Sequence, residues 1–246
     1  MTDMHHPRNF LGLDPEFTNH DRAKVVVLPI PYEATCSYGI GTSKGPAAII
    51  EASNQVELWD EELDRETYRI GISTLDPVLP AKNSPQGQVA RVRAAAAPLL
   101  EQGKFILGLG GEHTVSLGLI QALTDRHPKF SILQVDAHLD LRNQYEGTAF
   151  SHASVMRRVS EQGLKIVCCG ARAFDREEWE FAREADVTVF LGREIRTSTD
   201  FIPAAVAALT GPVYVTIDLD GLDPQCCPST GTPEPGGMGY YQLLAL

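Results

Sequence analysis

Carboxylate and imidazole side chains gather in three short clusters, each directly after an apolar segment of the chain. The clusters are GGEHT after FILGLG, DAHLD after SILQV and DLD after VYVTI, and their candidate metal ligands are His113, Asp136, His138, Asp140, Asp218 and Asp220. Side chains of extended chain alternate between two faces, so the D-x-H-x-D and D-x-D spacings can each direct their side chains toward one point. The pattern is typical of a metal site shared by three chain segments.

These six ligands exceed what one catalytic ion needs, because such an ion keeps positions open for water or substrate. They suit two ions, about 3.5–4 Å apart and bridged by carboxylates. No thiolate takes part, and four carboxylates with two imidazoles favour Mn²⁺, with Fe²⁺, Co²⁺ or Zn²⁺ as alternatives. We predict two Mn²⁺ ions. Taken singly, each of the six could equally be a helix cap or an ordinary polar group at a strand end.

The elements that would position these clusters alternate along most of the chain. Apolar segments predict strands over 23–30, 68–75, 104–110, 129–138, 164–170, 186–191 and 212–220. Helical segments lie between them, one beginning at Ser84-Pro85 with a serine cap, while residues 1–20 form an irregular arm. This alternation indicates one α/β domain over 1–246 with a mostly parallel sheet covered on both faces. Sites in such folds form beyond the carboxyl ends of the strands, where the three clusters lie.

Composition narrows the classes of partner. The chain has 246 residues and a formal net charge of −11, which argues against binding to nucleic acid or to anionic membranes. An acidic balance fits a cationic substrate, but it also serves solubility. No signal peptide is recognisable and no apolar run reaches the roughly 18 residues that span a bilayer. The five cysteines form no C-x-x-C pair, so we predict a cytoplasmic protein with free thiols.

Longer motifs resemble the ureohydrolases, the family of arginases, agmatinases and their relatives. They are GGEHT, DAHLD, SHASVMRR and IDLDGLDP, together with PYEATCSYGIGTSKGPAAI near the start and TGTPEPGGM near the end. EGTAF followed by SHASVMRR is closer to the agmatinase branch than to arginases proper. The resemblance implies a three-layer α/β/α sandwich that assembles into homo-oligomers, usually trimers or hexamers.

The resemblance also implies a role for each residue. The ligands of one manganese ion would be His113, Asp136, Asp140 and Asp218. The ligands of the other would be His138, Asp136, Asp218 and Asp220, so that Asp136 and Asp218 bridge. His152 falls where the family has a histidine near the mouth of the active site that is thought to relay protons. We therefore predict His152 and Asp140 as catalytic residues.

The chemistry of a guanidino substrate agrees with such a site. A guanidinium carbon is a poor electrophile and water at neutral pH is a weak nucleophile, but two ions can lower the pKa of water from 15.7 to about 7. Attack by the resulting hydroxide would release urea and an amine, and a histidine such as His152 could protonate that amine. We expect agmatine as substrate, with putrescine and urea as products. Arginine, guanidinobutyrate and formiminoglutamate remain alternatives.

Two departures from the family pattern stand out. Ser229 follows Pro228 where the family usually has glycine. The chain stops at Leu246, inside a predicted helix, whereas the family continues through a strand that carries a substrate-binding glutamate and through a final helix. We therefore expect that the C-terminal part of the domain is missing, that activity is weak, and that the strand over 212–220 has an exposed apolar edge.

Two other functions compete with this hypothesis. A dimetal phosphoesterase also uses D-x-H, but the GDxxD and GNH[DE] motifs that it would need further along do not occur. A metal-binding but inactive fragment or oligomer partner is the non-enzymatic alternative, and the expected loss of the C-terminal segment favours it. Release of urea by the chain with Mn²⁺ separates this alternative from the enzyme.

Overall fold

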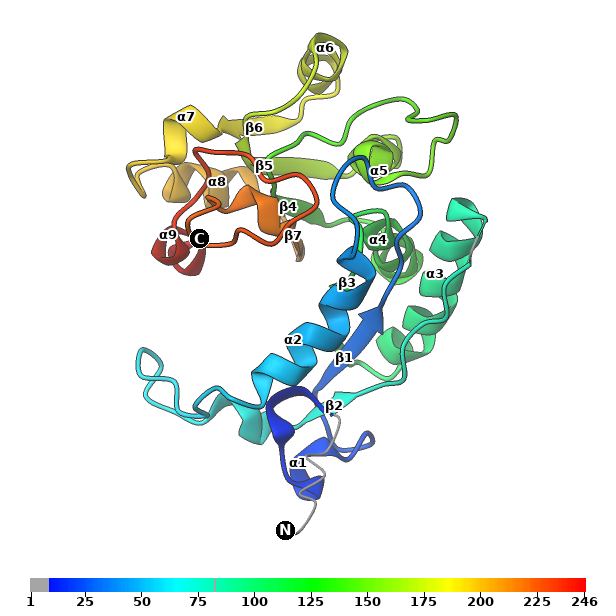
Figure 1. Cartoon of the computed structure of the whole chain (residues 1–246), viewed down its shortest axis with the longest axis vertical. Coiled ribbons are helices and arrows are strands. Elements are labelled where there is room, and N and C mark those ends of the chain that lie inside the picture. The colour runs from blue at the N-terminus through cyan, green and yellow to red at the C-terminus, as the bar shows by residue number, and fades with distance from the viewer. Residues whose placement is uncertain (1–8, 82) are drawn as a thin grey trace.

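The computed structural model of the chain describes residues 9–81 and 83–246 (Figure 1). Parallel strands form the centre of the molecule. Within these ranges the strands are β1 (Val25–Ile30), β2 (Ile72–Thr74), β3 (Phe105–Gly110), β4 (Ser131–Val135), β5 (Lys165–Ala171), β6 (Thr188–Leu191) and β7 (Val213–Ile217). They follow the predicted apolar segments because β-branched and other apolar side chains suit a sheet that is buried on its faces.

Helices alternate with these strands. Within the described ranges they are α1 (Pro15–Thr18), α2 (Gly45–Ser53), α3 (Pro85–Glu101), α4 (Val115–Arg126), α5 (Val155–Ser160), α6 (Arg176–Glu184), α7 (Gly192–Ile195), α8 (Ile202–Ala208) and α9 (Tyr240–Ala245). Local chemistry fixes several of their starts. The Ser84 side chain accepts a hydrogen bond from the Gly87 amide at α3, as its serine-proline start predicts, and Asp175 forms a capping box with Glu178 at α6.

The strands form two parallel sheets, β2-β1-β3 and β6-β5-β4-β7. β4 pairs with β7 in register from Ser131 beside Val213 to Val135 beside Ile217. The two strands therefore end at the same level, and the residues that follow them, Asp136 and Asp218, leave the sheet side by side.

Helices cover both faces of the strands, which confirms the three-layer α/β/α class. On one face of β4 and β5, Ile132 packs into a buried cluster with residues of α4, α5 and α6. On the other face, Leu133 packs with residues of α7 and α8. Helix α4 also packs against β1 through Leu119, so it joins the two sheets (Figure 1). This shared helix begins directly after the first polar cluster.

β7 lies at an edge of its sheet in the part of the chain that the structure describes. Its side chains alternate: Thr216 is buried toward α4, whereas Val213, Val215 and Ile217 are 41%, 52% and 46% exposed. Three apolar side chains of this edge strand are therefore partly exposed in the described part of the chain.

Three predicted strands, 68–75, 129–138 and 212–220, are at least four residues shorter in the structure, and the second of them is reduced to β4 (Ser131–Val135). The segment 68–75 begins in a 3₁₀ helix (Thr67–Ile70), and only Ile72–Thr74 forms a strand, because Gly71 between them has a φ of +83°. The predicted strand 212–220 ends at Ile217 and is followed by the 3₁₀ turn Leu219–Gly221. Of the irregular arm, residues 1–8 lie outside the described residues. Among those described, no helix is long and apolar enough to cross a membrane.

Candidate metal centre

His113 follows β3 through a close backbone contact. A Cβ atom at Gly111 would collide with the carbonyl oxygen of Tyr32, so only glycine lets the chain turn from the strand into α4 here. The turn buries His113 and places its Nδ1 atom 2.8 Å from Asp140 and 3.1 Å from Asp136. Its Nε2 atom lies 2.8 Å from Thr216 Oγ1, which leaves Nδ1 directed toward the carboxylates.

Asp136, His138 and Asp140 follow β4 and point to different partners. Asp136 is buried, and its Oδ1 atom accepts a hydrogen bond from the His138 amide at 2.7 Å. His138 Nδ1 lies 3.5 Å from Asp136 and 3.3 Å from Asp220, and this side chain is 28% exposed. Asp140 adopts a left-handed backbone with a φ of +54°, which turns its carboxylate toward His113.

Asp218 and Asp220 follow β7, Asp218 at the cap of the 3₁₀ turn Leu219–Gly221 and Asp220 within it. Asp218 caps that turn by accepting a hydrogen bond from the Asp220 amide at 3.2 Å, and its other oxygen lies 3.8 Å from His113 Nδ1. Asp220 is buried and accepts hydrogen bonds from the Ala137 amide and the Thr232 hydroxyl, both at 3.1 Å. The turn thus sends the two carboxylates toward different histidines.

The six predicted ligands therefore come together from the ends of β3, β4 and β7. Among the described residues, two groups have ligand atoms within 4.8 Å of one another: the first is His113, Asp136 and Asp140, and the second is Asp136, His138 and Asp220. Asp136 belongs to both groups. Asp218 belongs to neither, although it reaches His113.

One step of the sequence reasoning is wrong. Period-two alternation predicts that Asp136, His138 and Asp140 converge on one point, and likewise Asp218 and Asp220. Neither motif is extended chain. In the first, the backbone of Asp140 is left-handed. In the second, Leu219–Gly221 forms a 3₁₀ turn. The D-x-H-x-D motif consequently contributes ligands to both groups, whereas the D-x-D motif contributes Asp220 to the second group and directs Asp218 toward His113.

Burial and the crowding of these charges shift the pKa of several of these groups. Burial, together with the charge of Asp136, raises the pKa of the Asp140 carboxyl to about 7. Burial, with the charges of Asp220 and Asp136, raises the pKa of Asp218 to about 8. Burial opposes the imidazolium form of His138, but Asp136 and Asp220 outweigh it and raise its pKa to about 11. These directions describe a cluster with more negative charge than its own two histidines can balance.

The same cluster fits divalent cations. Its atoms are carboxylate oxygens and imidazole nitrogens, a set that suits Mn²⁺ and similar ions. His113 has Thr216 at its second ring nitrogen, the arrangement in which an outer partner fixes the ring of a metal-binding histidine. Burial opposes the ionised form of Asp136, but His113 and His138 outweigh it and hold the pKa of this carboxyl well below its usual range. Asp136 belongs to both groups, so it is the residue that could bridge two ions.

His152 lies beside this cluster on a 3₁₀ turn (His152–Ser154) before α5. Burial lowers its pKa; Glu112 opposes that shift, while His113 and His138 reinforce it. Its ring nitrogens contact two hydroxyl groups, Nδ1 at 3.1 Å from Thr35 and Nε2 at 2.9 Å from Ser37. Sequence reasoning missed both partners, although they lie in the PYEATCSYG segment that carries the family resemblance.

Glu112 is a further buried residue that sequence reasoning missed. It precedes His113 in GGEHT, and its carboxylate accepts hydrogen bonds from the Ala34 and Thr35 amides and from two threonine hydroxyls. Only its place in the motif could have drawn attention to it, because its partners lie 77 and 78 residues away along the chain.

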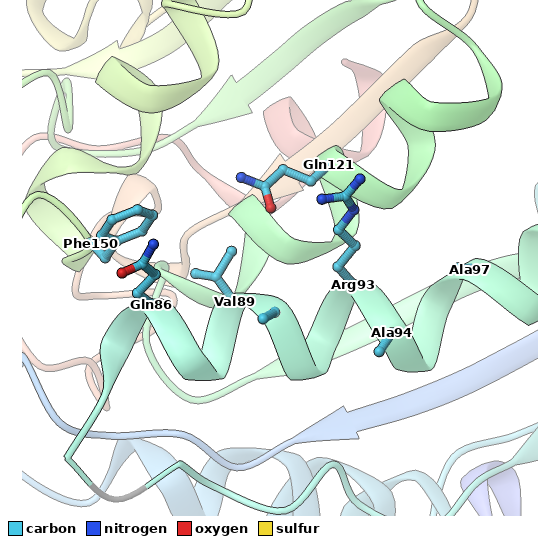
Figure 2. A pocket seen from close by; sticks show the side chains of 8 residues that line it. Gln86, Val89, Arg93, Ala94, Ala97, Gln121 and Phe150 are labelled. Carbon is cyan, nitrogen blue, oxygen red and sulfur yellow. The ribbon is translucent and has the colours of Figure 1, made fainter.

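A surface hollow formed by described residues lies away from the predicted ligands. It measures about 540 Å³ and is formed on the outer side of α3 and α4, with Gln86, Arg93, Gln121 and Phe150 at its walls (Figure 2). None of the six predicted ligands lines it. Its one charged lining residue, Arg93, pairs with Asp125 outside the hollow, and the remaining lining residues are neutral, so it offers no group for hydrolytic chemistry.

Known proteins resemble this chain over nearly its whole length. The arginase family model matches residues 23–246. A N(1)-aminopropylagmatine ureohydrolase of Synechocystis is 41% identical, over 98% of this chain and 83% of its own. An agmatinase of Bacillus anthracis is 35% identical, over 96% and 80% respectively. The crystal structure of an agmatine ureohydrolase of Thermoplasma volcanium has a TM-score of 0.83 at 29% identity, covering 91% of this chain and 76% of that one.

A buried aspartate and histidine cluster at the carboxyl ends of parallel strands, in a chain with these relatives, defines the class of protein. The chain belongs to the arginase family. Within that family it is an agmatinase-like ureohydrolase, an enzyme that hydrolyses linear amidines.

Proposed function

We propose that this chain is a dimetal amidinohydrolase that cleaves a guanidino compound to urea and an amine. The observation that carries the proposal is the pair of ligand groups that share Asp136. The first ion would be held by His113, Asp136 and Asp140, and the second by Asp136, His138 and Asp220. Asp218 would complete both sets by a small shift, since it already lies 3.8 Å from His113. Mn²⁺ is the ion that we propose for both.

The ions, when bound, would supply a nucleophile by lowering the pKa of water to about 7. The residues of the chain would bind the substrate and transfer the proton. The carboxylates hold negative charge where a guanidinium cation must come to lie. His152, whose lowered pKa keeps it neutral near pH 7, can take up a proton and pass it to the departing amine. His152 and Asp140 are thus the catalytic residues that we propose, Asp140 acting as a ligand.

Agmatine is the substrate that we propose, with putrescine and urea as products, which would give the enzyme a place in polyamine biosynthesis. N(1)-aminopropylagmatine is the second candidate. Four relatives that are 34–41% identical to this chain carry its name, and the two molecules share the guanidino group on an aliphatic cation. The net charge of −11 suits either cation.

We further propose that residues 1–246 belong to a single ureohydrolase domain, that the protein acts in the cytoplasm, and that it forms a trimer or hexamer. Light scattering coupled to size-exclusion chromatography measures that last property directly. A monomer at micromolar concentration would contradict it.

Urea release tests the proposed activity. The chain is loaded with Mn²⁺ and given agmatine, N(1)-aminopropylagmatine, arginine or guanidinobutyrate in parallel, and its metal content is measured in the same sample. We expect urea from one or both agmatine compounds and much less from arginine. The matched control is Asp136→Asn, which keeps the size of the side chain and removes the shared negative charge. A chain that holds two ions and releases no urea from any of these compounds would be the inactive metal-binding protein instead.

A further inference from the structure

Glu112, Thr35 and His152 form a continuous hydrogen-bonded array beside the metal centre. Thr35 Oγ1 lies 2.8 Å from Glu112 Oε1, 3.1 Å from His152 Nδ1 and 3.3 Å from the His152 amide nitrogen. Thr35 is 7% exposed and Glu112 is 5% exposed, so water does not compete for these contacts. The array joins three segments that are far apart in the sequence.

The direction of each hydrogen bond follows from the donors present. All the described contacts of the Glu112 carboxylate are with donors: the Ala34 and Thr35 amides, the Thr35 and Thr114 hydroxyls and the Cys36 thiol. A carboxylate in this setting is an acceptor only. Thr35 has one hydroxyl proton, and its 2.8 Å contact with Glu112 requires that proton to lie between the two oxygens.

The two lone pairs of Thr35 Oγ1 then remain for His152. One accepts from the backbone amide of His152, and the other can only accept from a proton on Nδ1. Neutral His152 therefore carries its proton on Nδ1, and Nε2 is left with the lone pair. Ser37, 2.9 Å from Nε2, donates to that lone pair.

We propose that Thr35 and Glu112 are positioning residues that hold His152 as the Nδ1–H tautomer, so that Nε2 is the atom that exchanges protons. The role of His152 itself rests on the proposed function, but its tautomer does not. Because Glu112 adjoins His113 in the chain, one segment fixes both the ring that exchanges protons and a ring of the metal centre.

The array and a neighbouring aromatic ring also restrain the orientation of the His152 ring. A 180° flip of the ring would put the carbon atom Cδ2 against Thr35 and lose the Nδ1 contact, and the ring of Tyr145 packs edge-on against His152 at 5.3 Å between centroids. The orientation of a catalytic ring is worth as much as its pKa, because a proton moves only over hydrogen-bond distance.

Nitrogen NMR on histidine-labelled protein tests the tautomer directly. The full chain is freed of paramagnetic ions, its histidines carry ¹⁵N, and His152→Gln assigns the signals of His152. Near pH 8 we expect the wild type and Thr35→Ser, which keeps the hydroxyl, to show protonated Nδ1 and unprotonated Nε2. Thr35→Val, which keeps the shape and loses the hydroxyl, should show a mixture of tautomers or protonated Nε2.

Thr114→Val is the matched control for that variant. It removes a different threonine hydroxyl from the same Glu112 oxygen, at 2.7 Å, without touching His152. It should keep the Nδ1–H signature, which separates loss of the array from a general disturbance of Glu112. Protonated Nε2 in the wild type, or an unchanged Nδ1–H signature in Thr35→Val, overturns the proposal.

Kinetics then connects the array to turnover. With equal metal content, Thr35→Val should lower kcat by about 10- to 100-fold with KM nearly unchanged, by analogy with outer partners of metal-bound histidines. Thr35→Ser should restore most of the loss. If the wild type releases no urea while the NMR signatures follow the expected pattern, the proposed function fails and the array stands. Normal urea release by Thr35→Val with a changed tautomer would remove the array from catalysis.

Discussion

The pKa of histidine is shifted in opposite directions on the two sides of the candidate site, the side lined by carboxylates and the side lined by hydroxyl groups. On the carboxylate side, Asp136 and its neighbours raise the pKa of His113 and His138 despite burial. On the hydroxyl side, His152 meets Thr35 and Ser37 and its pKa is lowered, first by burial. A histidine among carboxylates is charged until a cation replaces its proton, whereas one among hydroxyls is neutral and free to exchange a proton near pH 7. The difference separates metal binding from proton transfer.

Asp136→Asn should have the largest effect, because it removes the one carboxylate that both ligand groups share. We expect bound metal to fall from two ions per chain to one or none, with urea release lost. Plasma emission analysis after dialysis gives the stoichiometry. Two ions retained in this variant would contradict the dimetal arrangement.

His152→Ala should change proton transfer on the hydroxyl side and leave metal binding on the carboxylate side intact. Turnover should fall by roughly 10²–10⁴-fold, the usual contribution of a proton-transfer group, while both ions stay bound. The wild type should lose activity below its lowered His152 pKa, where Nε2 is protonated, and the variant should lack that limb of its pH profile. Rates measured from about pH 5 to 10, together with metal content at each pH, decide this. Turnover close to wild type would remove His152 from the mechanism.

Thr216→Val should weaken the carboxylate side without breaking it. Thr216 supports the Nε2 atom of His113, and loss of such an outer partner costs about 10- to 100-fold in metal affinity. Thr232→Val is the matched control, since it removes a hydroxyl at 3.1 Å from Asp220 in the more exposed group. Competition with a fluorescent chelator measures both affinities. Equal losses of metal affinity in Thr216→Val and Thr232→Val would show that the hydroxyl partners of the two ligand groups contribute equally to metal binding.

The smallest expected effect is on stability as a function of pH. In the metal-free chain, Asp140 and Asp218 have folded pKa values of about 7 and 8 against an ordinary 3.8, and His138 has about 11 against 6.5. The folded state therefore binds more protons than the unfolded state, so the free energy of unfolding falls as the pH rises. The contribution of the two aspartates is lost between about pH 4 and 8, and that of His138 from about pH 6.5 upward.

The melting temperature of the metal-free chain should accordingly fall as the pH rises from 6 to 9, because these groups bind more protons in the folded state than in the unfolded state. Added Mn²⁺ should reverse the fall, and its stabilising effect should grow with pH because ions then no longer compete with protons. Asp218→Asn should flatten the metal-free trend. A melting temperature that rises over this range without metal would contradict the pKa directions.

The alternation of strands and helices could be predicted from the sequence because it depends on local properties. Apolar runs, the serine cap of α3 and the capping box of α6 act over a few residues, and the structure places those elements where the pattern does. The strand at 68–75 was overpredicted because the left-handed backbone of Gly71 breaks an otherwise apolar run.

The sequence by itself determined the kinds of ligand and the strand ends at which they lie, since residue type and hydrophobic pattern are local. Only the tertiary structure decided how they divide. Asp140 turns to His113 through a left-handed residue, and Asp220 turns to His138 through a 3₁₀ turn. The contact of Thr35 with His152 spans 117 residues, and no local pattern encodes it, because it exists only once β1 and β3 have paired and the segment before α5 has packed against them.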